Sequence, residues 1–351
     1  MGTPRQKALF DDAFDPEPAA PRGRAAAPVL PMPIDPAIAE VAARLPAEVR
    51  LGTSSWSFPG WTGLVYAPRE GRPESEQRLA REGLSAYAAC PLFRTVSLDR
   101  TFYAPLAAEE YARYAAKVPA GFRFVVKAPS AVTDPFARAS GSGMVGGDNP
   151  LFLDAATAAA TCVTPAVAGL GSTLGAIVFQ CPPLGRRLLA DVPRLVARLV
   201  AFFAAIPRPR TDAMPEGPCL ALEIRDPELL GDGLAAGLAD TGVVPCLAGH
   251  ARMPPLDEQA AAWRLERSPV TRPLVCRWNL HAGHDYEGAK QAWFPFDRLV
   301  EEDVATRGAL ARLARGASAA GRPVLVTVNN KAEGSAPWSV RRLAESIVHP
   351  E

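Results

Sequence analysis

Short apolar runs rich in β-branched residues recur along the chain, and most of them are separated by stretches that favour helices. Each run is short enough to form a strand buried on both faces, as the strands of parallel sheets are. Strands that alternate with helices predict parallel β/α topology. The eight expected strands are Val49–Ser54, Phe93–Asp99, Phe122–Ala128, Gly175–Cys181, Pro218–Ile224, Val243–Leu247, Pro273–Trp278 and Pro323–Asn329.

Eight such units favour a closed (β/α)8 barrel over an open, doubly wound sheet, which is the competing α/β architecture. Two connections are long, 129–174 and 248–272, and long connections are often lids or binding loops. In the first of them, the glycines of Ser140–Gly143 and Gly146–Gly147 predict flexible hinges. The expected helices include Leu106–Lys117, Asp191–Ile206, Glu228–Asp240 and Glu302–Ala319.

The first 34 residues consist largely of Ala, Pro, Arg and Asp, with too little apolar surface to offset the entropy of ordering. They predict a disordered tail, and we expect residues before about Pro33 to contribute nothing to stability. Asp35 is a suitable N-cap, and Pro36 suits the first position of a helix that runs through Ala43. The chain from 35 to 351 is therefore expected to be one barrel domain.

The net charge bears on which partners the protein binds, and the cysteines bear on the compartment in which it is found. A formal net charge of +1 creates no global field that would attract nucleic acids or acidic membranes. No window approaches the ~20 uninterrupted apolar residues of a membrane span, and no apolar stretch near the start suits a signal peptide. The six cysteines contain no CxxC pair, which favours buried free thiols of a reducing compartment. We expect a cytoplasmic protein without membrane contact.

Seven sequence blocks, in order, carry a family resemblance. The first is Leu51–Trp61 with Gly63 and Tyr66, which is similar to G-T/C-S-S-W-x-Y-x-x-W-x-G-x-x-Y. The others are Val96–Tyr103, Phe122–Ala128, Phe179–Pro183, Glu223–Arg225, Arg277 with His281, and Asn329–Asn330. Together they resemble the uncharacterised DUF72, or YecE-like, family over the whole chain except the N-terminal extension. The resemblance implies a (β/α)8 barrel and a site location, without an agreed activity.

Several positions depart from the family pattern. Ser97 replaces the usual Glu and Asp99 the usual Asn of the second block. Asp134 follows Thr133 where a His is common, and the His-Gly pair has become His281-Ala282-Gly283. Any chemistry that relies on those side chains is therefore altered or lost in this chain.

Nearly every matching block ends a strand, and functional residues of such barrels gather at the carboxyl ends of the strands. Alternation along the second strand places Thr95, Ser97 and Asp99 on one face, directed inward. Glu223 and Arg225 also share a face, so that both meet one ligand or Arg225 holds Glu223 ionised. The candidate catalytic residues are Lys127, Glu223, His281 and Asp99. The candidate substrate-binding residues are Trp56, Tyr103, Gln180, Arg225, Arg277, Asn329 and Asn330.

Each candidate also has a structural interpretation. Lys127 is a base, an electrophile or a Schiff-base former, or else the ion-pair partner of Glu223 or Asp99. His281 is an acid or base, or a hydrogen-bonded structural histidine; His250 is a weaker candidate. The aromatic side chains suit stacking on a sugar or a base, but equally fill the core under the rim. His281 and His284 lie three apart with only Asp285 as a nearby carboxylate, so we expect no metal and no cofactor.

Three functions remain open from the sequence. The first is an enzyme, such as a hydrolase, lyase or isomerase, that acts by acid–base chemistry on a small polar, anionic or sugar-like substrate. The second is a nucleic-acid-binding protein or nuclease-like barrel, suggested by fold analogy alone and disfavoured by the neutral charge. The third is a non-catalytic ligand-binding protein. A narrow polar pocket at the barrel mouth would favour the first, and a broad basic groove the second.

Overall fold

The computed structural model describes residues 27–71, 73–138 and 145–350. Eight parallel strands close into a barrel in the order β1-β10-β9-β8-β7-β6-β3-β2, with β2 paired to β1. Closure excludes the open sheet and confirms the predicted barrel, since every predicted strand is present with ends shifted by at most one or two residues. The strands are β1 (Val49–Thr53), β2 (Phe93–Leu98), β3 (Arg123–Lys127), β6 (Leu174–Gln180), β7 (Leu220–Glu223), β8 (Val244–Gly249), β9 (Leu274–Trp278) and β10 (Val324–Val328).

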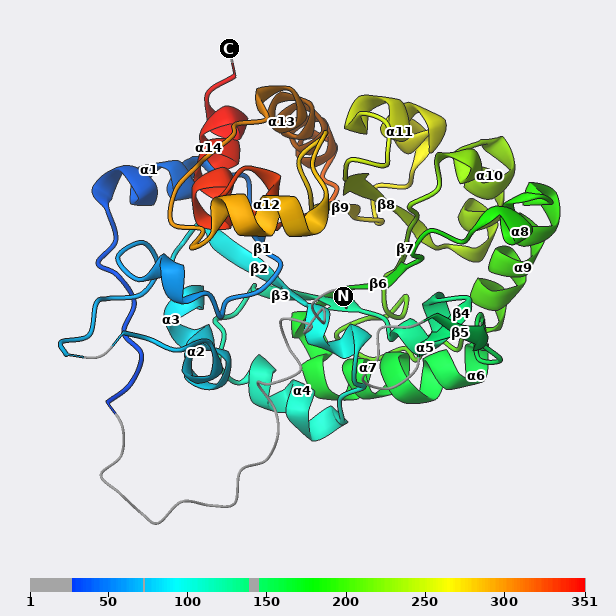
Figure 1. Cartoon of the computed structure of the whole chain (residues 1–351), viewed down its shortest axis with the longest axis horizontal. Coiled ribbons are helices and arrows are strands. Elements are labelled where there is room, and N and C mark those ends of the chain that lie inside the picture. Colours follow the sequence, from blue (N-terminus) through cyan, green and yellow to red (C-terminus); the bar gives the residue numbers. More distant parts are fainter. Residues whose placement is uncertain (1–26, 72, 139–144, 351) are drawn as a thin grey trace, which may run out of the picture.

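Helices surround the strands on the outside of the ring (Figure 1). The first begins as expected, because the Asp35 side chain accepts a hydrogen bond from the Ala37 N–H at 2.9 Å and Pro36 occupies the first turn. The helices are α1 (Pro36–Arg44), α2 (Glu76–Glu82), α3 (Leu84–Ala88), α4 (Ala108–Ala115), α5 (Ser130–Thr133), α6 (Ala155–Ala158), α7 (Thr164–Leu170), α8 (Arg186–Leu189), α9 (Val192–Ala205), α10 (Asp232–Thr241), α11 (Leu256–Ala262), α12 (Tyr286–Trp293), α13 (Val304–Ala319) and α14 (Ala336–Val348).

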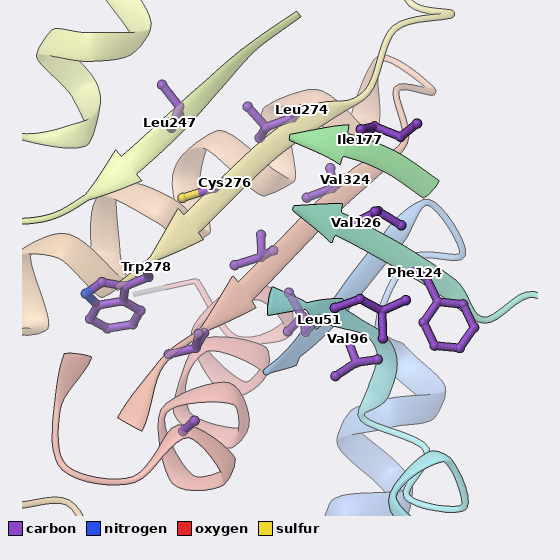
Figure 2. Close-up of a cluster of buried hydrophobic side chains, with 14 of the residues drawn as sticks. Leu51, Val96, Phe124, Val126, Ile177, Leu247, Leu274, Cys276, Trp278 and Val324 are labelled. Atoms are coloured by element: carbon purple, nitrogen blue, oxygen red, sulfur yellow. The ribbon is translucent and has the colours of Figure 1, made fainter. Parts of the chain in front are cut away.

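Alternation along the strands divides the core into two layers. On β9, Cys276 and Trp278 point outward into the large cluster between strands and helices, which Figure 2 shows together with Leu51 and Val126. Val275, which precedes Cys276, points inward. The barrel interior is filled mostly by small and branched side chains, namely Val125, Ala176, Val178, Ala221, Val244, Cys246, Val275 and Leu325. Position 277, two residues beyond Val275, therefore reaches the carboxyl-terminal mouth on the inner face.

The two long connections contain more regular structure than expected. Connection 129–174 carries α5, α6, α7 and an antiparallel hairpin of β4 (Phe136–Arg138) and β5 (Val145–Asp148). The hinge prediction is wrong for Gly146–Gly147, which belong to strand β5; residues 140–143 lie outside the described residues. Connection 248–272 is the ordinary helical connection of a barrel repeat, because α11 lies within it.

One helical segment, 155–173, is long and apolar enough to cross a membrane by length and composition. Its α7 part packs against α4 in the shell of the barrel, where a Cβ at Gly169 would lie only 2.2 Å from the Ala108 carbonyl oxygen. The segment therefore covers the barrel wall.

The cytoplasmic location stays a prediction. All six cysteines are unpaired, and four of them are buried.

Part of the expected tail packs on the barrel, so the disorder prediction is wrong for residues 27–34. Val29 is buried, and Met32 N–H donates to the Val65 carbonyl at 2.9 Å. Ala67 N–H donates to the Leu30 carbonyl at 2.9 Å. The prediction overlooked that a short extended segment needs only one buried side chain and an unpaired backbone edge to dock. Residues 1–26 lie outside the described part of the chain.

A chain that starts at residue 35 is expected to unfold at a temperature a few degrees lower than a chain that starts at residue 27. Removal of the segment exposes the site of Val29 and frees two backbone hydrogen bonds, which together cost about 1–3 kcal/mol. Calorimetry of the two truncations and the full chain measures the difference. Equal melting temperatures for the two truncations would contradict this docking.

Candidate functional site

Strands β2, β3, β7 and β9 all bring a charged side chain to the carboxyl end of the barrel. Lys127 is the last residue of β3, Glu223 the last of β7, and Arg277 the next to last of β9. Asp99 begins a 3-10 turn (Asp99–Phe102) directly after β2. Because parallel strands present their carboxyl ends on one face, residues distant in sequence meet there.

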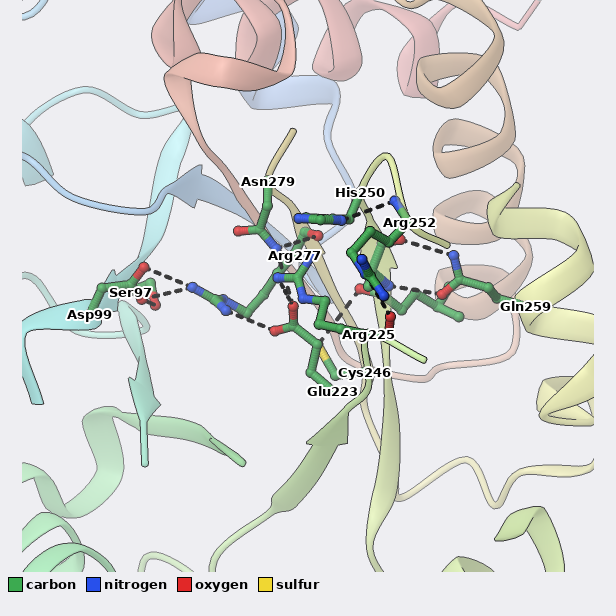
Figure 3. Close-up of polar contacts among 12 residues, drawn as sticks. Ser97, Asp99, Glu223, Arg225, Cys246, His250, Arg252, Gln259, Arg277 and Asn279 are labelled. Carbon is green, nitrogen blue, oxygen red and sulfur yellow. Dashed lines mark hydrogen bonds and ion pairs between the residues drawn. The ribbon is translucent and has the colours of Figure 1, made fainter. Parts of the chain in front are cut away.

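Arg277 is the centre of this ion network (Figure 3). Its Nη1 donates to Glu223 Oε2 at 2.7 Å, and its Nη2 donates to both Asp99 oxygens at 2.7 and 2.9 Å. Ser97 Oγ donates to Asp99 Oδ1 at 2.5 Å, so the inward polar face predicted for β2 supports the network. Arg277 and Glu223 are buried, and each neutralises the other's charge.

Both carboxylate oxygens of Glu223 already have cationic partners. Arg225 forms an ion pair with Oε1, and Asn279 Nδ2 donates to the same oxygen at 3.2 Å. Burial alone would raise the pKa of this carboxyl, but Arg225 and Arg277 outweigh it and hold the pKa below the ordinary value. Of the two interpretations left open for Arg225, the geometry matches the one in which it keeps Glu223 ionised.

Lys127 lies beside the network without joining it. Its Nζ is 3.7 Å from the centroid of the Phe102 ring, and within the described residues it forms no ion pair. Burial lowers the pKa of Lys127 to about 7; Asp99 and Glu223 oppose this shift, whereas Arg277 and Arg225 add to it. The geometry therefore does not support the ion-pair interpretation of Lys127. A partly buried amine that is half neutral near pH 7 can accept or donate a proton.

Lys331 is a second amine at this mouth, and sequence reasoning missed it. Its side chain is buried, with Nζ 3.9 Å from the centroid of Tyr286 and 5.6 Å from that of Phe296. Burial lowers its pKa to about 8; the charge of Lys290 adds to this shift, whereas Glu287 and Asp99 oppose it. The aromatic faces stabilise the cation without neutralising it. The signal available in the sequence was its position, one residue after the Asn329–Asn330 block.

His250 borders the network after β8. Its Nδ1 accepts a hydrogen bond from the Arg252 N–H at 3.1 Å, which leaves the proton of the neutral ring on Nε2. Burial and the charge of Arg225 lower the pKa of His250 to about 4, so the imidazole is neutral at ordinary pH. Its charge therefore does not change in the physiological range.

His281 contacts none of the other predicted catalytic residues. Its Nδ1 is 2.7 Å from the Ala282 carbonyl oxygen, and its ring lies near His284, Glu301 and Trp293. The predicted convergence of Lys127, Glu223, Arg225 and His281 therefore holds in the geometry for the first three. His281 belongs to a separate group of side chains beyond the rim.

The predicted substrate-binding residues are spread over different environments. Asn330 is buried, and its Oδ1 accepts from Ala336 N–H at 2.8 Å and Trp61 Nε1 at 3.3 Å, which gives it a structural role. Asn329 Nδ2 donates to Ser54 Oγ at 2.9 Å near the mouth. Tyr103 is exposed beside Phe102, and Gln180 ends β6 opposite Glu223. Asn329, Tyr103 and Gln180 lie at the carboxyl-terminal end of the barrel, as Arg225 and Arg277 do.

Trp56 is buried, with its indole N–H donating to the Leu79 carbonyl at 3.0 Å and its ring edge against Tyr114. It also lines a small cavity next to Ser97 and Asp99, about 30 Å³ in volume. A cavity of this size admits a group of one or two heavy atoms. A larger hollow of about 750 Å³ lies at the other end of the barrel, around the residues that precede β7 and β9.

Fold and site together define a (β/α)8 barrel protein with a buried ion network and two amines at the carboxyl-terminal mouth. Residues 50–350 match the family of proteins of unknown function designated DUF72. The chain belongs to this family. No significant match is found among curated proteins.

Two solved structures of DUF72 family proteins are similar to this chain. The protein from Thermotoga maritima MSB8 shares 18% identity, with a TM-score of 0.53 over 86% of this chain and 99% of that one. The protein from Enterococcus faecalis V583 shares 14% identity, with a TM-score of 0.52 over 86% of this chain and 96% of that one. At these identities the likeness concerns the fold, which it supports over nearly the full length of both relatives.

Proposed function

We propose that this protein is an enzyme that acts on a small anionic substrate at the carboxyl-terminal mouth, with Lys127 as the group that moves the proton. The observation that carries the proposal is the charge distribution of the mouth. Arg225 and Arg277 are neutralised by Glu223 and Asp99, so Lys127 and Lys331 are left as cations that the network does not neutralise. An anion that binds beside either ammonium group would gain electrostatic attraction that the ion network does not already use.

Residue usage supports the proposal. The chain contains five lysines among 38 basic residues, and two of the five lie at this mouth. Arginine cannot lose its proton in a protein, whereas a buried lysine can. A site that needs only fixed positive charge is equally well built from the arginine that this chain otherwise uses. Lysine at both positions therefore favours a site in which the side chain transfers a proton or changes its protonation state.

The roles of the predicted catalytic carboxylates follow from their contacts. Glu223 and Asp99 both accept hydrogen bonds from Arg277. Arg225 and Arg277 hold the pKa of Glu223 below its ordinary value, which makes Glu223 a weak base. The two carboxylates instead orient Arg277 and set the electrostatic field at Lys127. Asn329, Gln180 and Tyr103 are the neutral side chains placed to hydrogen-bond a polar ligand.

Lys127→Met is expected to leave the fold intact and to abolish stabilisation by the anionic ligand. The fold survives because the structure shows no carboxylate paired with Lys127 that the substitution would strand. Thermal unfolding with phosphate, sugar phosphates and dicarboxylates measures the effect, and product analysis of any ligand that raises Tm separates an enzyme from a non-catalytic binding protein.

Lys117→Met is the matched control, since Lys117 is exposed and donates only to the Arg81 carbonyl. We expect it to respond to ligands as the wild type does. If none of these anions raises Tm, or if the Lys127 and Lys117 variants respond alike, the proposed function is wrong.

A further inference from the structure

Beyond the rim, two histidines and a glutamate face one another. His281 and His284 lie in the turn between β9 and α12, and Glu301 lies in the segment before α13. His284 Nε2 is 2.8 Å from Glu301 Oε2, and His281 Nε2 is 3.8 Å from Glu301 Oε1. One ligand atom from each residue lies within 4.8 Å of the other two. Ligands around a tetrahedral Zn²⁺ ion at ~2.1 Å are roughly 3.4 Å apart, so small rotations of the side chains suffice.

The hydrogen bond of His281 leaves a lone pair directed at this group. The Ala282 carbonyl can only accept, so His281 Nδ1 carries a proton at 2.7 Å from it. In the neutral ring, Nε2 then has no proton, although it faces a carboxylate oxygen. Two acceptors that face each other repel unless a proton or a cation lies between them. An N–H donated to a backbone carbonyl is also the outer-shell contact that orients metal-binding histidines.

The backbone holds the three residues in place from both sides. Gly283 has a φ of +84°, a left-handed conformation that lets the chain turn between the two histidines. His281 N–H donates to the Lys331 carbonyl at 2.8 Å, and Val300 N–H donates to the Glu333 carbonyl at 2.8 Å. The loop that carries Lys331 therefore fixes both halves of the group. The Trp293 ring packs against both imidazoles, with centroids at 6.1 and 5.0 Å.

We propose that His281, His284 and Glu301 bind a divalent transition-metal ion of the Zn²⁺ type. Two imidazoles and one carboxylate form the ligand set of three-ligand Zn²⁺ sites, which leave a fourth position open. Mg²⁺ and Ca²⁺ are disfavoured because they prefer oxygen ligands. The sequence alone disfavoured a metal because Asp285 was the only carboxylate in view; Asp285 in fact caps α12 through Gly288 N–H at 2.8 Å. The ion would fasten the turn after β9 to the segment before α13.

The inference is tested with untagged, metal-stripped full-length protein titrated with ZnCl₂ by calorimetry. We expect one Zn²⁺ per chain and a rise in Tm, because an ion that binds only the folded state stabilises it. His284→Asn and Glu301→Gln each remove a direct ligand, so each should weaken binding by more than the roughly 10–100-fold typical of losing an outer-shell contact, and should remove the rise in Tm. Both side chains are partly exposed, so the metal-free variants should melt close to the wild type.

Glu302→Gln is the matched control, because Glu302 is the next residue and about as exposed but pairs with Arg307 instead. Co²⁺ adds a second readout, since its visible spectrum should change on binding to the wild type and to Glu302→Gln but not to Glu301→Gln. Equal Zn²⁺ affinity of the Glu301 and Glu302 variants, or no 1:1 binding to the wild type, overturns the proposal. This outcome is independent of the anion tests on Lys127, which need no metal.

Discussion

Glu223→Gln is expected to lower the free energy of unfolding by about 3–5 kcal/mol, the cost typical of removing one partner from a buried ion pair. Glu223 is fully buried and accepts from Arg225, Arg277 and Asn279. Glutamine preserves the shape but removes the charge, and a guanidinium cannot neutralise itself by losing a proton. Arg225, itself buried, is left without its counter-charge, while Arg277 keeps Asp99.

Denaturant unfolding of the variant and of two comparison proteins measures this cost. Asp257→Asn removes the charge of an exposed pair with Arg312 and should change the free energy of unfolding by less than about 1 kcal/mol. Adding Arg225→Met to Glu223→Gln should recover part of the loss, because the stranded guanidinium is gone. A loss below about 1 kcal/mol for Glu223→Gln alone would mean that water reaches the network and screens it.

The barrel was predictable because its signals are local. Apolar β-branched runs identify buried strands, and their number and alternation with helices limit the topology. Helix α11 was missed although its own signals are present: Pro255 stands directly before Leu256, and Asp257 and Glu258 occupy the first turn. The packing of Val29 was not predictable in this way, since it depends on the backbone edge near Val65.

The location of the site was also predictable, because polar residues at strand ends must meet at one face. The sequence did not reveal which of the charged side chains neutralise each other. Arg277 pairs with Asp99 across 178 positions of sequence, and that pairing exists only once the barrel has closed. Lys331 and Glu301 were overlooked for the same reason. Lys331 lies against the Tyr286 ring, and Glu301 lies beside His284. No local sequence pattern shows that these pairs of residues are neighbours in the fold.

The remaining prediction with a large effect concerns the proton on Lys127. With its pKa lowered to about 7, roughly half of the Lys127 side chains are neutral at pH 7, compared with roughly one in 2,500 for an ordinary lysine. The folded state therefore binds fewer protons than the unfolded state between about pH 7 and 10.4. Stability rises with pH wherever the unfolded state binds more protons, so this residue makes the folded protein relatively more stable as pH rises through that window. Below pH 7 the folded state bears the full free-energy cost of burying the protonated Lys127 side chain.

Protein labelled with ¹³C at lysine Cε provides the direct measurement, since five lysines give a spectrum that single substitutions can assign. We expect a resonance that titrates near pH 7 and disappears in Lys127→Met, while Lys117 serves as the internal reference. The free energy of unfolding of the wild type relative to Lys127→Met should increase between about pH 7 and 10.4, as linkage requires. A Lys127 resonance that stays constant from pH 6 to 9 would show that the amine keeps its proton, and its proposed role in proton transfer would then pass to Lys331.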